Sequence, residues 1–347
     1  MSRISSLLVL TFLLVQAQAQ IPKEFFRFEY QGVSLHGVLN LPTGREPKGL
    51  VMIVHGSGRT NAVQQELHYD VRATLVQAGY GTYMWDKMGC GQSEGTFDYN
   101  QPVSSSAEEV LHAIRALQEA EIPGADQIGL WGISRAGWIN PIVISRYPGI
   151  KFWISVSGVD GKENFKYLLA QNLRIDGLPP DSIQLIVGEW AEGNRICHAG
   201  GSYEAYLAAT PHLNRNEFLR RFNGGEGNEE GYYAFQRGFM REEFEEATGL
   251  QVYIPHFDSL LLQVTCPVLA LFGEKDMNVD WTLTRSLYQR TLGVNTDLHI
   301  QSFPDGNHNL FQCKTGGFYE FQDDGLPWIR SEGFLEAMAN WLEDLTW

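Results

Sequence analysis

Short, almost wholly apolar runs recur along this chain, separated by segments long enough to form helices. Because the runs lack the apolar–polar alternation of half-exposed strands, they indicate strands buried on both faces, as in a parallel sheet. The runs lie at Gly49–Val54, Gly81–Trp85, Ile128–Ile133, Phe152–Val156 and Val268–Phe272, and a further strand is expected at His299–Phe303. This rhythm predicts an α/β fold, with helices flanking a mostly parallel central sheet.

Further elements are expected around these strands. Phe25–Gln31 and Ser34–Leu41 resemble a strand pair and predict a hairpin. The order of residues from Ser106 to Glu109 is that of a capping box, which predicts that a helix begins there. Other helices are expected at Leu67–Ala78, Arg135–Tyr147, Leu283–Leu292 and Gly333–Leu345.

The rhythm stops between residues 160 and 264, where the chain is largely polar with scattered aromatic residues. Within this segment Arg241–Ala247 resembles a short helix, and Asn223–Gly231 resembles a glycine-rich, acidic loop. A long excursion inside a regular α/β domain favours an insertion over a second independent domain. We therefore expect a core of residues 20–159 and 265–347, with a mainly helical inserted cap or lid of residues 160–264.

Composition and motifs exclude several classes of function. The formal net charge of −15 argues against nucleic-acid binding, because phosphate contacts need a basic patch. The chain has no Cys-x-x-Cys and no His-Glu-x-x-His, so no metal site is predicted. Gly89, Gly91 and Gly95 hint at a dinucleotide-binding turn, but the spacing is wrong and Thr96–Pro102 resembles a loop, so no cofactor is predicted.

The N-terminus has the order of a secretory signal. Arg3 precedes the apolar run Leu7–Val15, and small residues follow up to Ala19. The run is about half the ~20 apolar residues that a membrane span needs. We therefore expect residues 1–19 to be a signal peptide cleaved near Ala19, an exported (periplasmic or secreted) protein, and no stable membrane span elsewhere.

The chain has four cysteines, whose oxidation state depends on that compartment. In an oxidising environment they could form one or two disulfides, and the sequence leaves the pairing open. They are Cys90, Cys197, Cys266 and Cys313.

Ser134 follows the run Ile128–Ile133 directly and is flanked by small residues. Gly132–Ala136 matches the nucleophile-elbow signature, with alanine in place of its second glycine. A sharp strand-to-helix turn of this kind lifts the hydroxyl above the sheet. Ser134 is thus the candidate nucleophile, against the alternative of a serine that only caps the helix.

A serine hydroxyl needs a base to take its proton, and the base needs an acid to orient it. His308 follows the expected strand His299–Phe303 and is the candidate base. Asp276 closely follows Val268–Phe272 and is preferred as the acid over Asp280, four residues later, and Asp160. The chain order serine, aspartate, histidine is that of the α/β-hydrolases.

Two backbone amides are candidates for an oxyanion hole. The N–H of Arg135 follows the candidate nucleophile at a helix start. The other is expected from the loop His55–Gly58, with the Ser57 N–H as the donor, and His55 is interpreted as a structural residue of that loop.

Five stretches together resemble an α/β-hydrolase of the capped esterase and serine-aminopeptidase-like group, over nearly all of the mature length. They are VMIVHGSGRTN, WDKMGCGQSEG, GISRAGW, FGEKD and DGNHN, in this order. The resemblance implies a Ser134–Asp276–His308 triad and a lid made by the insertion. It does not imply a substrate, because this fold hosts many chemistries.

The leading hypothesis is an exported serine hydrolase of carboxylic esters, acting through an acyl-enzyme on Ser134 and on a small-molecule ester or acyl substrate. The first alternative is an aminopeptidase-like serine peptidase with the same triad. The second is a binding protein that kept the fold and lost catalysis. The sequence leaves the substrate's identity and the oligomeric state open.

Two groups of side chains in the insertion bear on the substrate. Glutamates there could hold a free amino terminus, although acidic residues are plentiful throughout; they are Glu189, Glu192, Glu204 and Glu229. Aromatic residues there either form an apolar acyl pocket or pack only as the insertion's own core. They are Trp190, Tyr203, Tyr206, Phe218, Phe222, Tyr232, Tyr233, Phe235 and Phe239.

The signal-peptide pattern predicts a defined mature N-terminus. Cleavage after Ala19 leaves Gln20 as the first residue. N-terminal mass spectrometry of the protein from its native host measures this directly. An intact Met1–Ala19 segment on a cytoplasmic product contradicts the prediction.

Overall fold

The computed structural model describes residues 20–225, 227–241 and 243–345. The predicted signal peptide lies outside the described residues. In the part that is described, no helix combines the length and apolar character needed to cross a membrane.

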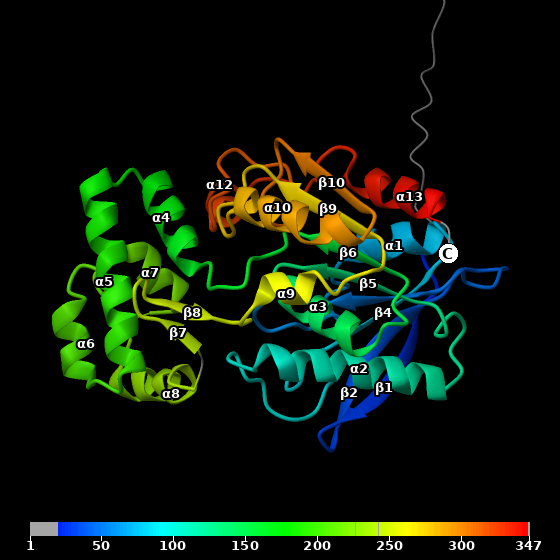
Figure 1. The fold of residues 1–347 in the computed structure, drawn as a ribbon, viewed down its shortest axis with the longest axis horizontal. Coiled ribbons are helices and arrows are strands. Elements are labelled where there is room, and N and C mark those ends of the chain that lie inside the picture. Colours follow the sequence, from blue (N-terminus) through cyan, green and yellow to red (C-terminus); the bar gives the residue numbers. More distant parts are fainter. Residues whose placement is uncertain (1–19, 226, 242, 346–347) are drawn as a thin grey trace, which may run out of the picture.

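An eight-stranded sheet in the order β1-β2-β4-β3-β5-β6-β9-β10 forms the centre of the molecule (Figure 1). β2 pairs antiparallel with both β1 and β4, and all other neighbours are parallel, as predicted. The strands are β1 (Glu24–Tyr30), β2 (Val33–Asn40), β3 (Leu50–Val54), β4 (Gly81–Trp85), β5 (Ile128–Ile133), β6 (Phe152–Val156), β9 (Val268–Gly273) and β10 (Leu298–Phe303).

Helices cover both faces of this sheet, which is why its central strands, such as β3 and β9, are buried at every position. In β3, Met52 packs into the core under one set of helices and the adjacent Ile53 into the core under the other. One face is covered by α1 (Tyr69–Gln77) and α13 (Phe334–Asp344). The other is covered by α2 (Val103–Glu119), α3 (Ala136–Arg146), α9 (Phe257–Leu261), α10 (Trp281–Arg290) and α11 (Leu292–Asn295). A short helix, α12 (Glu320–Asp324), lies in the segment between β10 and α13.

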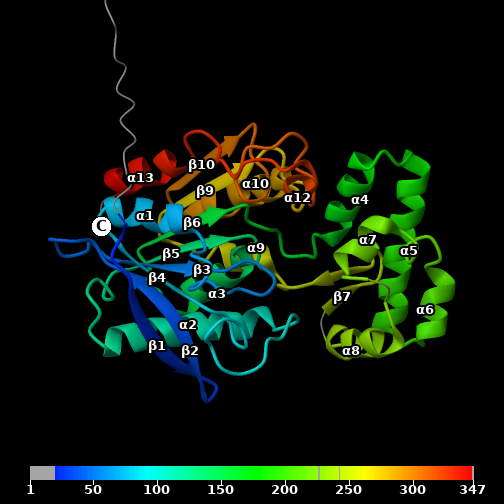
Figure 2. The same ribbon diagram turned by 180° about the vertical axis from the view of Figure 1, so that it is seen from behind.

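The elements from α4 to β8 form a separate, mainly helical lobe beside the sheet (Figures 1 and 2). We call residues 165–252 the helical lobe. Two connections join it to the core, one after β6 and one between β8 and α9. Its elements are α4 (Phe165–Ile175), α5 (Pro180–His198), α6 (Tyr203–Ala209), α7 (Glu217–Phe222), α8 (Glu229–Phe239), β7 (Glu243–Glu245) and β8 (Leu250–Val252).

The aromatic residues of the lobe pack mainly against one another. One cluster includes Trp190, Phe218 and Phe222, and a second gathers tyrosines around Tyr232 and Phe239. Phe235, one of the aromatic residues named from the sequence, has a side chain that is 43% exposed, and its ring stacks on that of Phe239. The structure therefore favours the interpretation that these residues form the core of the lobe.

Three local predictions were wrong. α2 begins at Val103, one turn before the apparent capping box, and Ser106 lies inside the helix. Arg241–Ala247 is not a helix, because Glu243–Glu245 forms β7 and pairs antiparallel with β8. The expected loop Asn223–Gly231 is shorter than predicted, since the Asn228 side chain caps α8 by accepting from the Gly231 N–H at 2.8 Å.

All four cysteines are free thiols. Cys90, Cys197 and Cys266 are buried, and Cys313 is half-buried. Burial raises the pKa of Cys197 to about 11 and that of Cys266 to about 12, so these thiols stay protonated at neutral pH. Neither of the disulfides left open by the sequence is formed.

Candidate active site

Ser134 occupies a sharp turn between β5 and α3. Its backbone φ of 57° lies in the left-handed region, which a residue other than glycine adopts only when its surroundings impose it. The Ser134 N–H donates to the Val156 carbonyl at 3.0 Å, and the Ser134 carbonyl accepts from the Gly137 N–H at 2.7 Å. The turn is thus fixed to β6 on one side and to the first turn of α3 on the other.

Close packing explains the small residues beside Ser134. A Cβ on Gly132 would lie 2.5 Å from the Cβ of Ala136 and 2.5 Å from the Asn140 amide nitrogen. A Cβ on Gly137 would lie 3.0 Å from the Val159 nitrogen. Ala136 fits where the signature has its second glycine because Gly132 leaves the space for its methyl group.

Asp276 and His308 form a buried hydrogen-bonded pair. The His308 Nδ1 lies 2.7 Å from the Asp276 Oδ2, and the two residues are 9% and 1% exposed. The other carboxylate oxygen accepts from the backbone N–H groups of Asn278 and Val279, both at 2.9 Å. The carboxylate is therefore fixed at both oxygens, and it orients the imidazole.

Glycine at the end of β9 brings the two loops together. A Cβ on Gly273 would lie 2.3 Å from the Asn307 carbonyl oxygen, so only glycine allows the His308 loop to approach this closely. Asp276 and His308 follow neighbouring parallel strands, β9 and β10, and lie at the same edge of the sheet.

The two rival acids have other partners. Asp280 is the N-cap of α10, where its side chain accepts from the backbone N–H groups of Thr282 and Leu283. Asp160 accepts from the Lys162 N–H at 3.1 Å, and burial raises the pKa of its carboxyl group. Of the three aspartates, the structure places Asp276 against His308.

The loop after β3 lies directly beside Ser134. A Cβ on Gly56 would lie 3.4 Å from both the Ile133 carbonyl oxygen and the Ser134 Cβ. Within the part of the chain that the structure describes, neither the Ser57 N–H nor the Arg135 N–H donates a hydrogen bond. Both amides are therefore free to bind a ligand oxygen.

His55 lies apart from the Asp276–His308 pair. Its Nε2 pairs with the Trp85 carbonyl, and its ring packs edge-on against the Trp85 indole at 4.8 Å between centroids. Burial lowers the pKa of His55 to about 3, which keeps it neutral. These contacts are those of a structural residue that fixes the loop after β3 to the end of β4.

The Ser134 hydroxyl makes no hydrogen bond to any described residue, so the expected contact between Ser134 and His308 is not formed in this structure. Ser134, Asp276 and His308 nonetheless follow the ends of β5, β9 and β10, which run parallel in one sheet. Catalytic hydrogen bonds are often long without substrate and shorten when it binds.

Sequence reasoning did not single out Lys87. Its ammonium donates to the carbonyls of Gly56 at 2.6 Å and Gly58 at 2.8 Å, on either side of Ser57. The preceding residue, Asp86, is fully buried and accepts from the N–H groups of Val63 and Gln92. The only signal for Lys87 in the sequence is its place at the end of a buried strand.

The glycine-rich turn after β4 is structural. The segment from Thr96 to Pro102 contains no helix start, in agreement with the sequence analysis. A Cβ on Gly91 would lie 2.1 Å from an Asp86 carboxylate oxygen, so glycine is required where this loop folds over the buried aspartate. In the described ranges, no three His, Cys, Asp or Glu side chains are placed to hold a metal ion.

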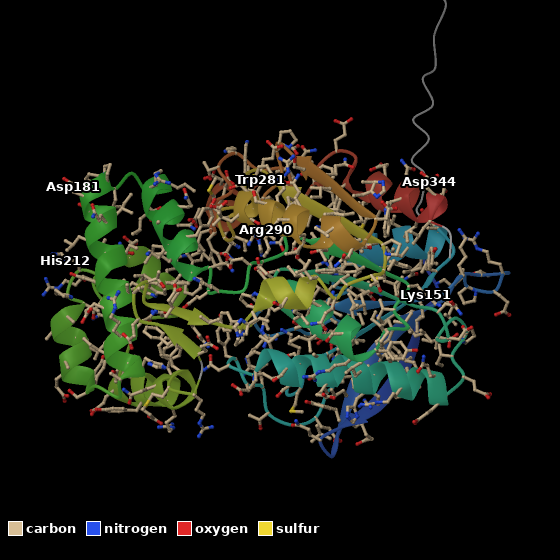
Figure 3. The ribbon with its side chains drawn as sticks, in the orientation of Figure 1. Lys151, Asp181, His212, Trp281, Arg290 and Asp344 are labelled. Carbon is tan, nitrogen blue, oxygen red and sulfur yellow. The ribbon has the colours of Figure 1, made fainter. Side chains whose placement is uncertain are left out.

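The glutamates of the lobe considered for amine binding have other surroundings. Glu189 accepts from the backbone N–H groups of His212 and Leu213, each at 2.8 Å, and pairs with the His212 ring. Figure 3 shows His212 on the side of the lobe that faces away from the sheet. Glu192 pairs with Arg195 on α5, while Glu204 and Glu229 are exposed in the first turns of α6 and α8.

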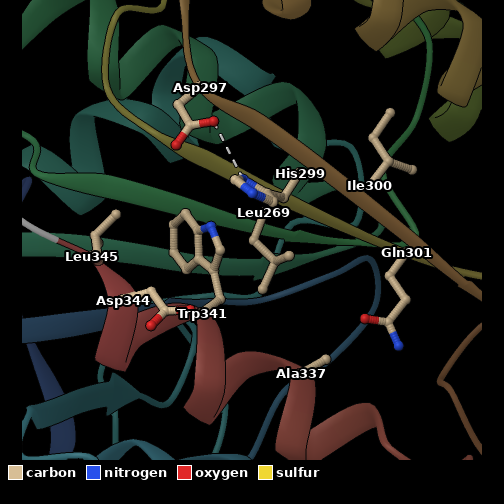
Figure 4. A pocket seen from close by; sticks show the side chains of 9 residues that line it. All are labelled: Leu269, Asp297, His299, Ile300, Gln301, Ala337, Trp341, Asp344 and Leu345. Atoms are coloured by element: carbon tan, nitrogen blue, oxygen red, sulfur yellow. Dashed lines mark ion pairs between the residues drawn. The ribbon is translucent and has the colours of Figure 1, made fainter.

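A cavity of about 260 Å³ lies at the edge of the core, between β10 and α13 (Figure 4). It is lined by Leu269, Asp297, His299, Ile300, Gln301, Ala337, Trp341, Asp344 and Leu345. Asp297 and His299 lie at the start of β10, whereas His308 follows its end. This cavity is therefore separate from the site around Ser134.

Comparisons with known proteins agree with the α/β fold described above. Residues 45–170 match a family described as serine aminopeptidase, S33. The esterase Pf2001 of Pyrococcus furiosus is 13% identical, over 98% of this chain and 98% of its own, with a TM-score of 0.53. No curated protein matches the chain in sequence.

Two further solved structures share the fold. Est1E of Butyrivibrio proteoclasticus, solved with ferulic acid, is 14% identical over 92% of this chain and 96% of its own, with a TM-score of 0.51. The proline iminopeptidase of Mycobacterium smegmatis is 16% identical over 92% of this chain and 98% of its own, with a TM-score of 0.52.

The sheet order and the parallel strand pairs, together with these matches, define an α/β architecture shared with known hydrolases. The chain has the α/β-hydrolase fold, as its sequence motifs predicted.

Because the three aspartates have different hydrogen-bond partners, we expect their substitution by asparagine to affect activity differently. Asp276→Asn should lower ester turnover on the order of 10⁴-fold, because the amide no longer holds the imidazole in the tautomer that a base requires. Asp280→Asn and Asp160→Asn should stay within a few-fold of the wild type, since an amide oxygen still accepts the backbone N–H bonds. Steady-state kinetics of the three variants measure this, and a greater loss in Asp160→Asn than in Asp276→Asn would identify a different acid.

Proposed function

We propose that this protein is a serine hydrolase that cleaves carboxylic esters of small molecules, with Ser134 as nucleophile, His308 as base and Asp276 as acid. The observation that carries the proposal is the buried Asp276–His308 pair, 2.7 Å apart, at the sheet edge where the strained turn presents Ser134. Such an arrangement has no evident structural use that would offset the strain at Ser134.

The geometry supports a defined proton path. Asp276 accepts from His308 Nδ1, so this nitrogen carries the proton and Nε2 is left as the acceptor. His308 takes the Ser134 proton as the serine oxygen attacks the ester carbonyl carbon, and it gives that proton to the leaving alcohol. Water then attacks the acyl-enzyme along the same path and releases the acid and free Ser134.

Charge develops on the carbonyl oxygen in both tetrahedral intermediates. The unengaged N–H groups of Ser57 and Arg135 are the proposed donors to this oxygen. Arg135 stands at the start of α3, where backbone N–H groups are unsatisfied and the helix dipole favours negative charge.

The helical lobe is proposed to act as a cap over this site. Tyr167, on α4, donates its hydroxyl to the Asp276 backbone carbonyl at 3.1 Å, so the lobe contacts the acid loop directly. Export remains a proposal as well. It is supported by the signal pattern and by Ile21, which is buried and whose N–H donates to the Tyr69 hydroxyl at 3.2 Å, anchoring the chain just after the expected cleavage point.

A serine peptidase with the same three residues is the second candidate, and the family match and the proline iminopeptidase neighbour favour it. Two observations weigh towards esters. Glu189 is satisfied by backbone amides, so it is not free to bind an amino terminus. An alkoxide also leaves more readily than an amine, so an ester needs less assistance from the protein.

Removal of the nucleophile tests the proposal. Ser134→Ala should abolish ester turnover and leave the fold intact, with only the residual catalysis that an oxyanion hole supplies. A fluorophosphonate probe should label the wild type at Ser134 and leave the variant unlabelled, as mass spectrometry of the modified peptide can show. Absence of labelling in the wild type favours a binding protein without catalysis.

Matched substrates separate the esterase from the peptidase. We expect kcat/KM for short to medium acyl aryl esters to exceed that for matched aminoacyl amides by a wide margin. A preference for the amide that is lost in Glu192→Gln, Glu204→Gln or Glu229→Gln would identify a peptidase. Glu189→Gln serves as the structural control, because its effect should appear in thermal stability.

A further inference from the structure

Lys87 forms hydrogen bonds to the loop that contains Ser57. Its ammonium donates to the carbonyls of Gly56 at 2.6 Å and Gly58 at 2.8 Å. Its own backbone N–H donates to the Thr60 carbonyl at 3.2 Å. One residue at the end of β4 thus holds three carbonyls of the loop that follows β3.

The first of these carbonyls has a direct geometric link to the Ser57 amide. The Gly56 carbonyl and the Ser57 N–H belong to the same peptide unit, which is planar and trans. In a trans peptide the carbonyl oxygen and the amide hydrogen point in opposite directions. A donor that fixes the Gly56 oxygen therefore also fixes the direction of the Ser57 N–H.

The loop needs such a constraint. Gly56 and Gly58 flank Ser57, and Gly58 has a φ of 84° in the region that glycine enters freely. Side chains that would restrict rotation of the peptide unit are missing at both glycines. The Ser57 N–H has no acceptor of its own among the described residues, so nothing on the amide side holds the unit in place.

The ammonium is placed where a charge is costly for folding. Burial, together with the nearby Arg135 guanidinium, lowers the pKa of Lys87 to about 8, although Glu109 and Cys90 act in the opposite direction. A partly desolvated cation beside a second cation contributes little to the stability of the folded protein. Its positive charge on the Gly56 oxygen does, however, polarise the peptide and strengthen its N–H as a donor.

We propose that Lys87 is a positioning residue of the oxyanion hole: by binding the Gly56 and Gly58 carbonyls, it orients and polarises the Ser57 N–H toward the developing oxyanion. This inference rests on the proposed function, since it needs a reaction at Ser134. Lys87 acts through the loop backbone and does not itself touch the substrate.

The test compares four proteins with an aryl ester substrate. Lys87→Met removes the donor and the charge, and it should lower kcat on the order of 10²-fold, the loss typical of one oxyanion donor. KM should change by no more than a few-fold, because the N–H matters in the transition state. Lys87→Arg, which keeps the positive charge and several N–H donors, should recover most of the loss.

Lys23→Met is the matched control. Lys23 also donates to a backbone carbonyl near this loop, that of Val63 at 3.3 Å, but it contacts neither Gly56 nor Gly58. This variant should hydrolyse the ester at the wild-type rate. If Lys87→Met does not fold, Lys87→Gln, which keeps a donor without the charge, should give a smaller loss of kcat in the same direction.

A transition-state analogue separates positioning from a loss of structure. A trifluoromethyl ketone adds to a catalytic serine and places an anionic oxygen in the oxyanion hole. Its inhibition constant should rise in Lys87→Met by the same factor as kcat falls. Wild-type kcat in that variant, or a loss that only follows the fraction of folded protein, would overturn the inference.

Failure of the proposed function gives a different result. In that case the wild type neither hydrolyses the ester nor reacts with a fluorophosphonate at Ser134, and the role of Lys87 falls with it. If the wild type reacts and Lys87→Met reacts equally fast, the proposed function stands and the inference about Lys87 alone is wrong.

Discussion

The left-handed turn at Ser134 is the constraint on which the site depends. A non-glycine residue in this conformation costs about 1–3 kcal/mol, which the surrounding packing must offset. The Ser134 N–H bond to Val156 holds the turn against β6, and the absence of a side chain at Gly132 lets α3 begin at once. Because α3 begins there, the Arg135 N–H is unsatisfied at the same place. One packing solution thus fixes both the candidate nucleophile and a candidate oxyanion donor.

The backbone groups of the loops around that turn are not paired as in a helix or sheet. Two adjacent charged side chains at the end of β4 form hydrogen bonds with them instead. Asp86 supplies acceptors for the amides of Val63 and Gln92, while Lys87 supplies donors for the carbonyls of Gly56 and Gly58. Buried backbone groups must find partners, and a carboxylate and an ammonium satisfy groups of opposite kind. Two consecutive residues at the end of β4 therefore bind both the amide and the carbonyl groups of the loops beside Ser134.

The sequence predicted most of the sheet, because a strand buried on both faces must be apolar at consecutive positions. Gly81–Trp85, Ile128–Ile133 and Phe152–Val156 begin and end where they were expected. The pairing of Asp276 with His308 was also within reach, since both residues follow neighbouring strands of a parallel sheet. Chain order alone does not single out Asp276 among the three aspartates, because it does not show that Asp280 caps a helix.

Elsewhere, tertiary contacts overrode local patterns. The serine of the apparent capping box, Ser106, accepts instead from the Arg135 side chain at 2.9 Å, a partner 29 residues away, so α2 can begin earlier. β7 exists only because β8 pairs with it. Lys87 had no detectable motif, since its function as we infer it depends on two carbonyls 29 and 31 residues earlier in the chain.

The helical lobe contacts the loop of Asp276 and the segment that follows His308. Tyr167 of α4 holds the Asp276 carbonyl, and Arg221 of α7 forms two 2.7 Å bonds to Asp323 while its guanidinium lies over the Tyr319 ring. Asp323 and Tyr319 belong to the segment that leads away from His308. Because Asp276 and His308 are hydrogen-bonded to each other, both contacts of the lobe lie on segments that carry this pair.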